Sequence, residues 1–86
     1  MHKAAVETKL LAVVSSILGV PHASLSLGSS RDTVTEWDSL KHMHLMLGLE
    51  DEFRIEFTDQ EIGTLTSVSS LRDAIMSKTG GDGMRQ

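Results

Sequence analysis

The feature that most constrains the fold is a run of apolar residues at helical spacing between Ser39 and Phe53. Asp38 stands directly before this run, and its short acceptor side chain is typical of a helix N-cap. We therefore expect a helix over residues 39–53 with Ser39 in its first turn. The free backbone N–H groups and the helix dipole at that end would favour a negatively charged group on the Ser39 hydroxyl by about 0.3 to 1 kcal/mol.

The apolar residues of this helix fall on two faces, because successive side chains turn by about 100 degrees. One face is expected to pack against the rest of the chain and carries His42, Leu45, Met46, Leu49 and Phe53. The second face, flanked by His44 and Asp51, consists of Leu40, Met43 and Leu47. An apolar face without an internal partner is typical of an interaction site, although the preceding loop or another helix could also cover it.

Gly48 interrupts this helix at a cost of about 1 kcal/mol relative to alanine. Its neighbours in helical angle are Lys41 and His44, which predicts that it lies on the exposed side. We therefore interpret it either as a point of close approach for a partner's backbone or as a tolerated surface glycine.

Three further helices are expected, two long and one short. The first spans Ala4 to Leu18, ends at Gly19 and Pro21, and has a stripe formed by Val6, Leu10, Val13, Val14 and Ile17. A capping box over residues 58–61 predicts a short helix from about Asp59 that Gly63 stops early. Ser67 is the expected cap of a last helix whose apolar face is Val68, Leu71, Ala74 and Ile75.

The segments between these helices are irregular. Residues 20–37 show no sustained period, and we expect Leu25, Leu27 and Trp37 to fix this long loop over the helices. Residues 53–57 alternate like a strand but have no second strand to pair with, so we read them as an extended connection that pins Ile55 and Phe57. The chain is thus predicted to be an all-α, small four-helix bundle over residues 1–78, with a disordered tail over residues 79–86.

Composition narrows the function classes. The 86 residues contain no cysteine, which excludes a disulfide framework, a thiolate nucleophile and a zinc-cysteine site. The net charge of −4 disfavours binding to nucleic acid, which rewards clustered lysine and arginine. The sequence shows neither a signal peptide nor a membrane span, so a cytoplasmic protein is expected. We also expect the protein to be a monomer.

Metal binding and catalysis are disfavoured by spacing. His42 and His44 lie about 200 degrees apart around a helix and cannot share one ion, while His2 and His22 fall in a terminus and a loop. The acidic residues between positions 51 and 61 lack the ligand pattern of an EF-hand. A Ser39–His42 hydrolytic pair is conceivable but lacks an orienting third group. A helix-turn-helix regulator would need a basic recognition helix, whereas this one ends in Glu50-Asp51-Glu52.

The triplet Asp38-Ser39-Leu40, followed by a helix ending Glu50-Asp51-Glu52-Phe53, resembles the acyl carrier proteins. The predicted order of helices extends the resemblance over residues 4–78. It implies that Ser39 carries 4′-phosphopantetheine, donated by coenzyme A through a phosphopantetheinyl transferase. Acyl-loading and acyl-processing enzymes would then dock on Asp38, Leu40, Met43, His44 and Leu47.

The family resemblance also implies a non-enzymatic carrier that holds acyl intermediates as thioesters for fatty acid, polyketide or other specialised biosynthesis. Lys41, His42 and His44 make the start of the helix less acidic than in primary fatty acid carriers, and Trp37 precedes the motif. Both features favour a specialised pathway. The alternative interpretation is an aminoacyl or peptidyl carrier, or a helical adaptor that never bears the 4′-phosphopantetheine arm.

Overall fold

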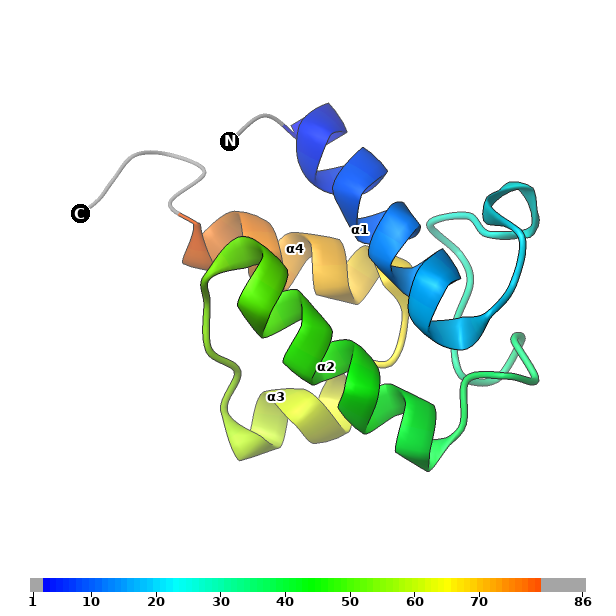
Figure 1. Cartoon of the computed structure of the whole chain (residues 1–86). Helices are drawn as coiled ribbons and strands as arrows, with labels where there is room; N and C mark the ends of the chain where they lie inside the picture. Colours follow the sequence, from blue (N-terminus) through cyan, green and yellow to red (C-terminus); the bar gives the residue numbers. More distant parts are fainter. Residues whose placement is uncertain (1–2, 80–86) are drawn as a thin grey trace.

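The computed structural model describes residues 3–79, and four α-helices make up its frame (Figure 1). They are α1 (Lys3–Leu18), α2 (Ser39–Phe53), α3 (Asp59–Thr64) and α4 (Val68–Lys78), with one 3₁₀ turn, η1 (His22–Ser24), after α1. The described residues form no β-strand. The predicted all-α four-helix class is therefore confirmed, whereas the predicted tail, apart from Thr79, and His2 lie outside the described residues.

The helix starts follow the local capping signals. Oδ1 of Asp38 accepts a hydrogen bond of 2.8 Å from the Lys41 backbone N–H, so α2 begins at Ser39 as predicted. Thr58 and Glu61 form the expected capping box of α3, and Ser67 caps α4. Gly63 does not end α3, which continues for one more residue to Thr64. Each cap joins residues three positions apart, which is why the sequence shows it directly.

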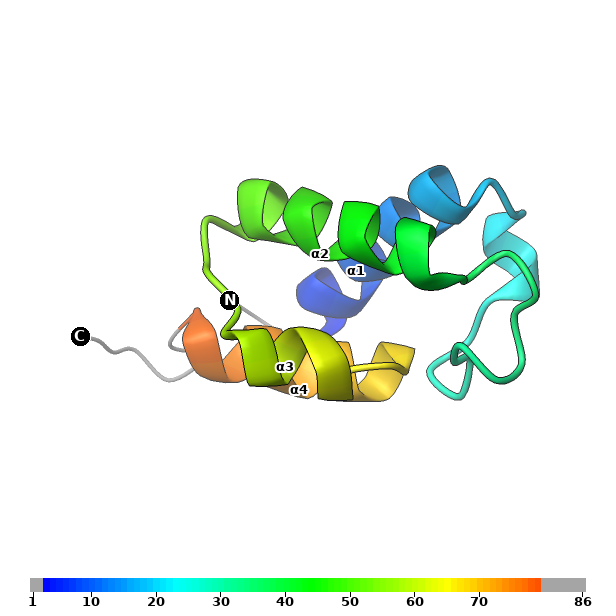
Figure 2. The same ribbon diagram turned by 90° about the horizontal axis from the view of Figure 1, so that it is seen from below.

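The helices form two layers (Figure 2). Helices α1 and α2 lie in one layer and α3 and α4 in the other, and α1 packs against both α2 and α4. The core between them is built from the buried side chains Val6, Leu10, Val14, Leu18, Leu45, Met46, Leu49, Val68, Leu71 and Ile75. On α1 the fully buried stripe runs through Leu18, whereas Val13 and Ile17 are only partly buried.

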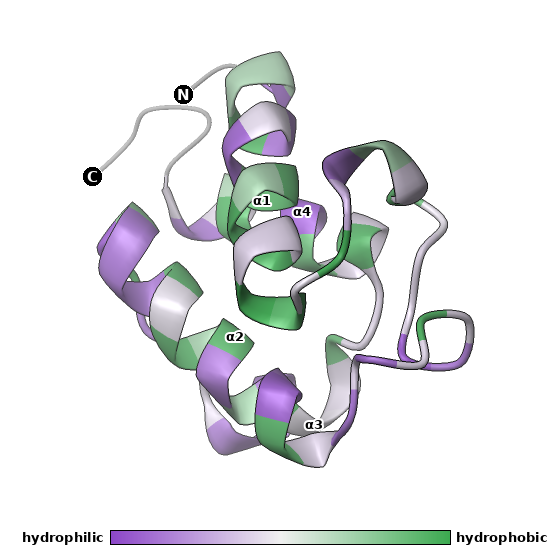
Figure 3. Ribbon diagram, turned by 45° about the vertical axis from the view of Figure 1, so that its right-hand side comes forward, coloured by the Kyte–Doolittle hydropathy of each residue, from purple (hydrophilic) through white to green (hydrophobic). Residues whose placement is uncertain are grey.

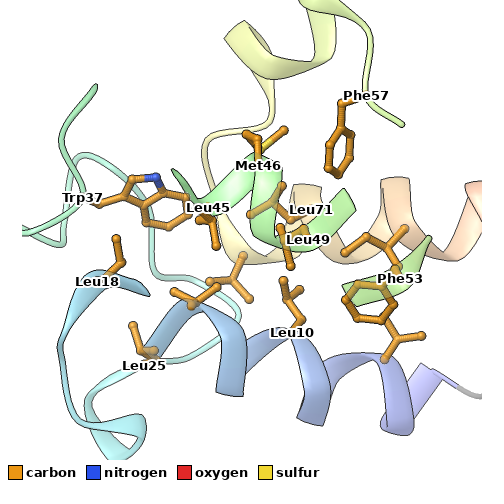
Figure 4. Close-up of a cluster of buried hydrophobic side chains, with 14 of the residues drawn as sticks. Leu10, Leu18, Leu25, Trp37, Leu45, Met46, Leu49, Phe53, Phe57 and Leu71 are labelled. Carbon is orange, nitrogen blue, oxygen red and sulfur yellow. The ribbon is translucent and has the colours of Figure 1, made fainter. Parts of the chain in front are cut away.

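The long loop over residues 19–38 packs on the end of this core. Trp37 and Leu25 are buried and Leu27 is partly buried, as the sequence predicts. Figure 4 shows Trp37 at one end of the cluster and Phe53 at the other. Phe57 is buried and Ile55 half-buried, so the connection between α2 and α3 also contributes to the core. The loop thereby fixes the start of α2, where Ser39 lies.

Candidate functional site

Ser39 is the first residue of α2, and its side chain is exposed. The preceding Asp38 has extended backbone, with φ −95° and ψ −174°, and its carbonyl accepts the N–H of His42 at 2.8 Å. The Ser39 hydroxyl therefore lies at the amino end of a 15-residue helix. Its oxygen is open to an approaching molecule and lies in the positive end of the helix dipole.

Arg31 is the neighbour that the sequence did not reveal. Its Nη2 atom donates a hydrogen bond of 3.1 Å to Oγ of Ser39. The two residues are eight positions apart and joined by irregular chain, so no helical or strand period relates them. A single basic residue in the loop before Ser39 was the available signal, and it does not specify a contact.

The path of the loop explains this placement. The Arg31 backbone N–H donates to the Thr66 carbonyl at 3.0 Å, and Ser30 forms an isolated antiparallel bridge with Ser67. The Val68 N–H donates to the Ser29 carbonyl at 2.9 Å. The loop is therefore tied to the start of α4, and this attachment sets where the Arg31 side chain begins.

His42, one turn along α2, makes no side-chain hydrogen bond to Ser39. Its Nδ1 accepts a hydrogen bond of 3.0 Å from Nε1 of Trp37, and its Nε2 lies 2.6 Å from the Ile62 carbonyl oxygen. Because the indole N–H can only donate, these contacts select the neutral tautomer with its proton on Nε2. Both ring nitrogens are thus engaged by the protein itself, and the Ser39–His42 hydrolytic pair is not formed.

The second apolar face of α2 is open to solvent. Leu40 is 64 %, Met43 43 % and Leu47 59 % exposed. His44 on α2 and Asp38 at its N-cap are also exposed, so all the sequence-predicted docking residues are open to solvent. Figure 3 shows hydrophobic and hydrophilic residues alternating along α2. Neither the loop nor another described helix covers this face.

The surroundings of Gly48 differ from the prediction that it lies on the exposed side of the helix. A Cβ atom added there would lie 2.8 Å from Cδ1 of Ile17, so the close approach is made by α1 of this chain. Nζ of Lys41 also reaches this region and donates to the Ile17 carbonyl at 3.2 Å. The predicted angular relation of Lys41 and Gly48 holds, but this side of α2 faces α1. An open hollow of about 400 Å³ lies between the two helices next to Gly48.

The histidines within residues 3–79 do not form a cluster. His22 lies in η1 and His44 on the outside of α2, while His42 is buried. Within residues 3–79, no three histidine, aspartate or glutamate side chains are grouped closely enough to hold a metal ion. None of the described helices is long and apolar enough to cross a membrane.

Comparison with known proteins relates the chain to an acyl carrier protein. No protein-family model matches the sequence. The chain is 34% identical over 70 residues to the acyl carrier protein of Buchnera aphidicola subsp. Baizongia pistaciae. The matched region covers 81% of this chain and 90% of that relative, so most of both chains is compared.

Proposed function

The chain belongs to the acyl carrier protein family, and from this premise we propose that Ser39 carries 4′-phosphopantetheine. Acyl carrier proteins are carriers and not enzymes, and they generally bear this prosthetic group. When bound, the group supplies a terminal thiol that holds acyl intermediates as thioesters. The chain's own residues present the attachment oxygen and the surface beside it.

The observation that carries the proposal is the exposed Ser39 hydroxyl at the capped start of α2. A transferase must reach this oxygen to join it to phosphorus. The serine proton is lost, the phosphoanhydride bond of coenzyme A breaks, and adenosine 3′,5′-bisphosphate leaves. Asp38 holds the helix start in place, and Arg31 touches the oxygen without covering it. The helix dipole favours the negative charge of the product by about 0.3 to 1 kcal/mol.

The face formed by Leu40, Met43 and Leu47 is the proposed docking surface for partner enzymes, with Asp38 and His44 at its edge. The partners are a phosphopantetheinyl transferase and the enzymes that load and process the acyl group. A surface with three separate apolar side chains allows docking and release, while the tether raises the local concentration of the intermediate at each partner. We place this carrier in the cytoplasm as a monomer that serves a specialised biosynthetic pathway.

Intact-protein mass spectrometry tests the proposal directly. The protein is incubated with coenzyme A and a broad-specificity phosphopantetheinyl transferase, and wild type is compared with Ser39→Ala. Ser16→Ala, which alters an exposed serine on α1, is the matched control. We expect one added phosphopantetheinyl group on wild type and on Ser16→Ala and none on Ser39→Ala. Modification of Ser39→Ala, or of none of the three proteins, would overturn the assignment.

The class of cargo is tested with the loaded form. The modified protein is offered a panel of acyl and aminoacyl donors together with their loading enzymes. Transfer of acyl groups supports the acyl carrier function, and exclusive transfer of aminoacyl groups would replace it with the aminoacyl or peptidyl carrier.

A further inference from the structure

We propose that Arg31 binds the phosphodiester that modification places on Ser39, and that it thereby positions the first atoms of the arm. The inference rests on the proposed function, since it requires the modified serine. The observation behind it is the hydrogen bond of 3.1 Å from Nη2 of Arg31 to Oγ of Ser39. Among residues 3–79, this is the only side-chain hydrogen bond made to Ser39 Oγ.

The chemistry of the two partners fits. After modification, Oγ becomes the ester oxygen bonded to phosphorus, and the negative charge resides on the two non-bridging oxygens of the same phosphorus. A guanidinium already in contact with Oγ is close to those oxygens. Its planar set of five N–H donors suits two phosphate oxygens better than a single hydroxyl does. The contact with the neutral hydroxyl would thus become a charge-assisted one.

The acidic residues near Ser39 make a positive charge at Arg31 favourable for binding the phosphodiester. The chain has a net charge of −4, and the loop before Ser39 carries Asp32, Glu36 and Asp38. A phosphodiester adds another negative charge beside them, which the helix dipole offsets only in part. Within residues 3–79, Arg31 forms no ion pair with a carboxylate, so its guanidinium is available for the new anion.

The backbone around Arg31 reduces the cost of the contact. Its N–H is bound to the Thr66 carbonyl at 3.0 Å, next to the bridge between Ser30 and Ser67. Only the side-chain torsions then have to be ordered when the phosphodiester is bound. Lys41 is the basic residue nearest to Ser39 in the sequence, but its Nζ is bound to the Ile17 carbonyl at 3.2 Å. Arg31 is therefore the better placed cation.

The test compares the unmodified and modified forms of wild type, Arg31→Gln, Arg31→Lys and Arg54→Gln. Arg54 is the matched control because it is exposed and lies at the opposite end of α2, so its replacement removes the same charge far from Ser39. Mass spectrometry first establishes modification of each protein. The readouts are then the ³¹P chemical shift of the phosphodiester, the ¹⁵N–¹H shift of the Arg31 Nε–H group, and the unfolding constant in urea.

We expect the Arg31 Nε–H resonance to move on modification and the ³¹P resonance to differ between wild type and Arg31→Gln, with Arg31→Lys between them. Arg54→Gln should match wild type. Loss of Arg31 should increase the unfolding constant about twofold to fivefold more in the modified than in the unmodified protein, the range for an exposed charge pair. Salt at about 1 M should reduce this difference.

The two proposals fail in different ways. If all four proteins are modified but Arg31→Gln and Arg54→Gln give the same ³¹P shift and the same change in unfolding constant, Arg31 does not bind the phosphodiester and the carrier function stands. If wild type is not modified at all, the carrier function falls and the role of Arg31 falls with it.

Discussion

Nε1 of Trp37 donates a hydrogen bond of 3.0 Å to Nδ1 of His42, and the two residues lie on either side of Ser39 in the chain. Both side chains are buried, and Nε2 of His42 is bound in turn to the Ile62 carbonyl on α3. One imidazole thus links the long loop, the first turns of α2 and α3. This buried polar contact therefore fixes the chain on both sides of the exposed Ser39.

This contact predicts that Trp37→Phe destabilises the fold by about 1 to 3 kcal/mol, because the buried Nδ1 of His42 is left without a donor. His42→Ala should cost about 2 to 4 kcal/mol through the cavity and two unpaired groups. Urea unfolding measures both. His44→Ala, on the exposed side of the same helix, should stay within about 0.5 kcal/mol of wild type. A Trp37→Phe protein as stable as wild type would show that the Trp37–His42 hydrogen bond contributes nothing to stability.

Substitutions at Gly48 and Ile17 should have coupled effects on the free energy of unfolding. Alanine at position 48 gains about 1 kcal/mol of helix propensity, but its Cβ meets Ile17 Cδ1 at 2.8 Å. We therefore expect Gly48→Ala to be nearly neutral in wild type and stabilising by about 1 kcal/mol in an Ile17→Val background, where Cδ1 is absent. Equal effects in both backgrounds, measured by urea unfolding, would contradict the close approach of α1.

Substitutions on the exposed apolar face of α2 should weaken docking without lowering the stability of the fold. Leu40→Ala and Leu47→Ala remove side chains that are 64 % and 59 % exposed, so each should change the free energy of unfolding by less than about 0.5 kcal/mol. Each should raise the KM of the transferase for the carrier. Leu45→Ala on the buried face should instead cost about 2 to 5 kcal/mol. An unchanged KM in both surface variants would remove this face from the proposed docking surface.

Asp38 has a structural and a proposed docking role, and two substitutions distinguish them. Asp38→Asn keeps an acceptor for the Lys41 N–H, whereas Asp38→Ala removes it and should cost about 0.5 to 2 kcal/mol. If the negative charge also serves docking, Asp38→Asn raises the transferase KM at low salt while the protein stays nearly as stable as wild type. Normal kinetics for Asp38→Asn would leave Asp38 as a cap alone.

Glu61 predicts a pH dependence of stability. The hydrogen bond from Lys78, together with the Thr58 backbone N–H, lowers the pKa of Glu61 below its usual value of 4.5. The folded state therefore favours the charged carboxylate, so its contribution is present above about pH 4.5 and is lost as the pH falls through the lowered pKa.

Glu61→Gln tests this dependence, because glutamine can keep the capping contact with Thr58 but not the charge. We expect its urea midpoint to fall less than that of wild type between about pH 6 and pH 3. In Glu56→Gln, which alters an exposed carboxylate on the α2–α3 connection, the urea midpoint should fall as much as in wild type over the same pH range. An equally large fall in Glu61→Gln would contradict the lowered pKa of Glu61.

The sequence predicted the parts of the site that depend on short spacings. Asp38, Thr58 and Ser67 cap their helices through residues three positions away, so the start of α2 and the position of Ser39 were readable. The two apolar faces of α2 were also readable, because the helical period alone sorts its residues into buried and exposed sets.

Only the tertiary structure decided which elements meet around that helix. The period placed Gly48 beside Lys41 correctly, but it contains no information on where α1 crosses, so the contact with Ile17 was missed. The Arg31–Ser39 contact depends on the loop being tied to Thr66, which is distant in sequence and has no periodic relation to either residue. Local spacing fixes helices and caps because their hydrogen bonds close within one turn, whereas contacts between segments are set by the packing of the whole chain.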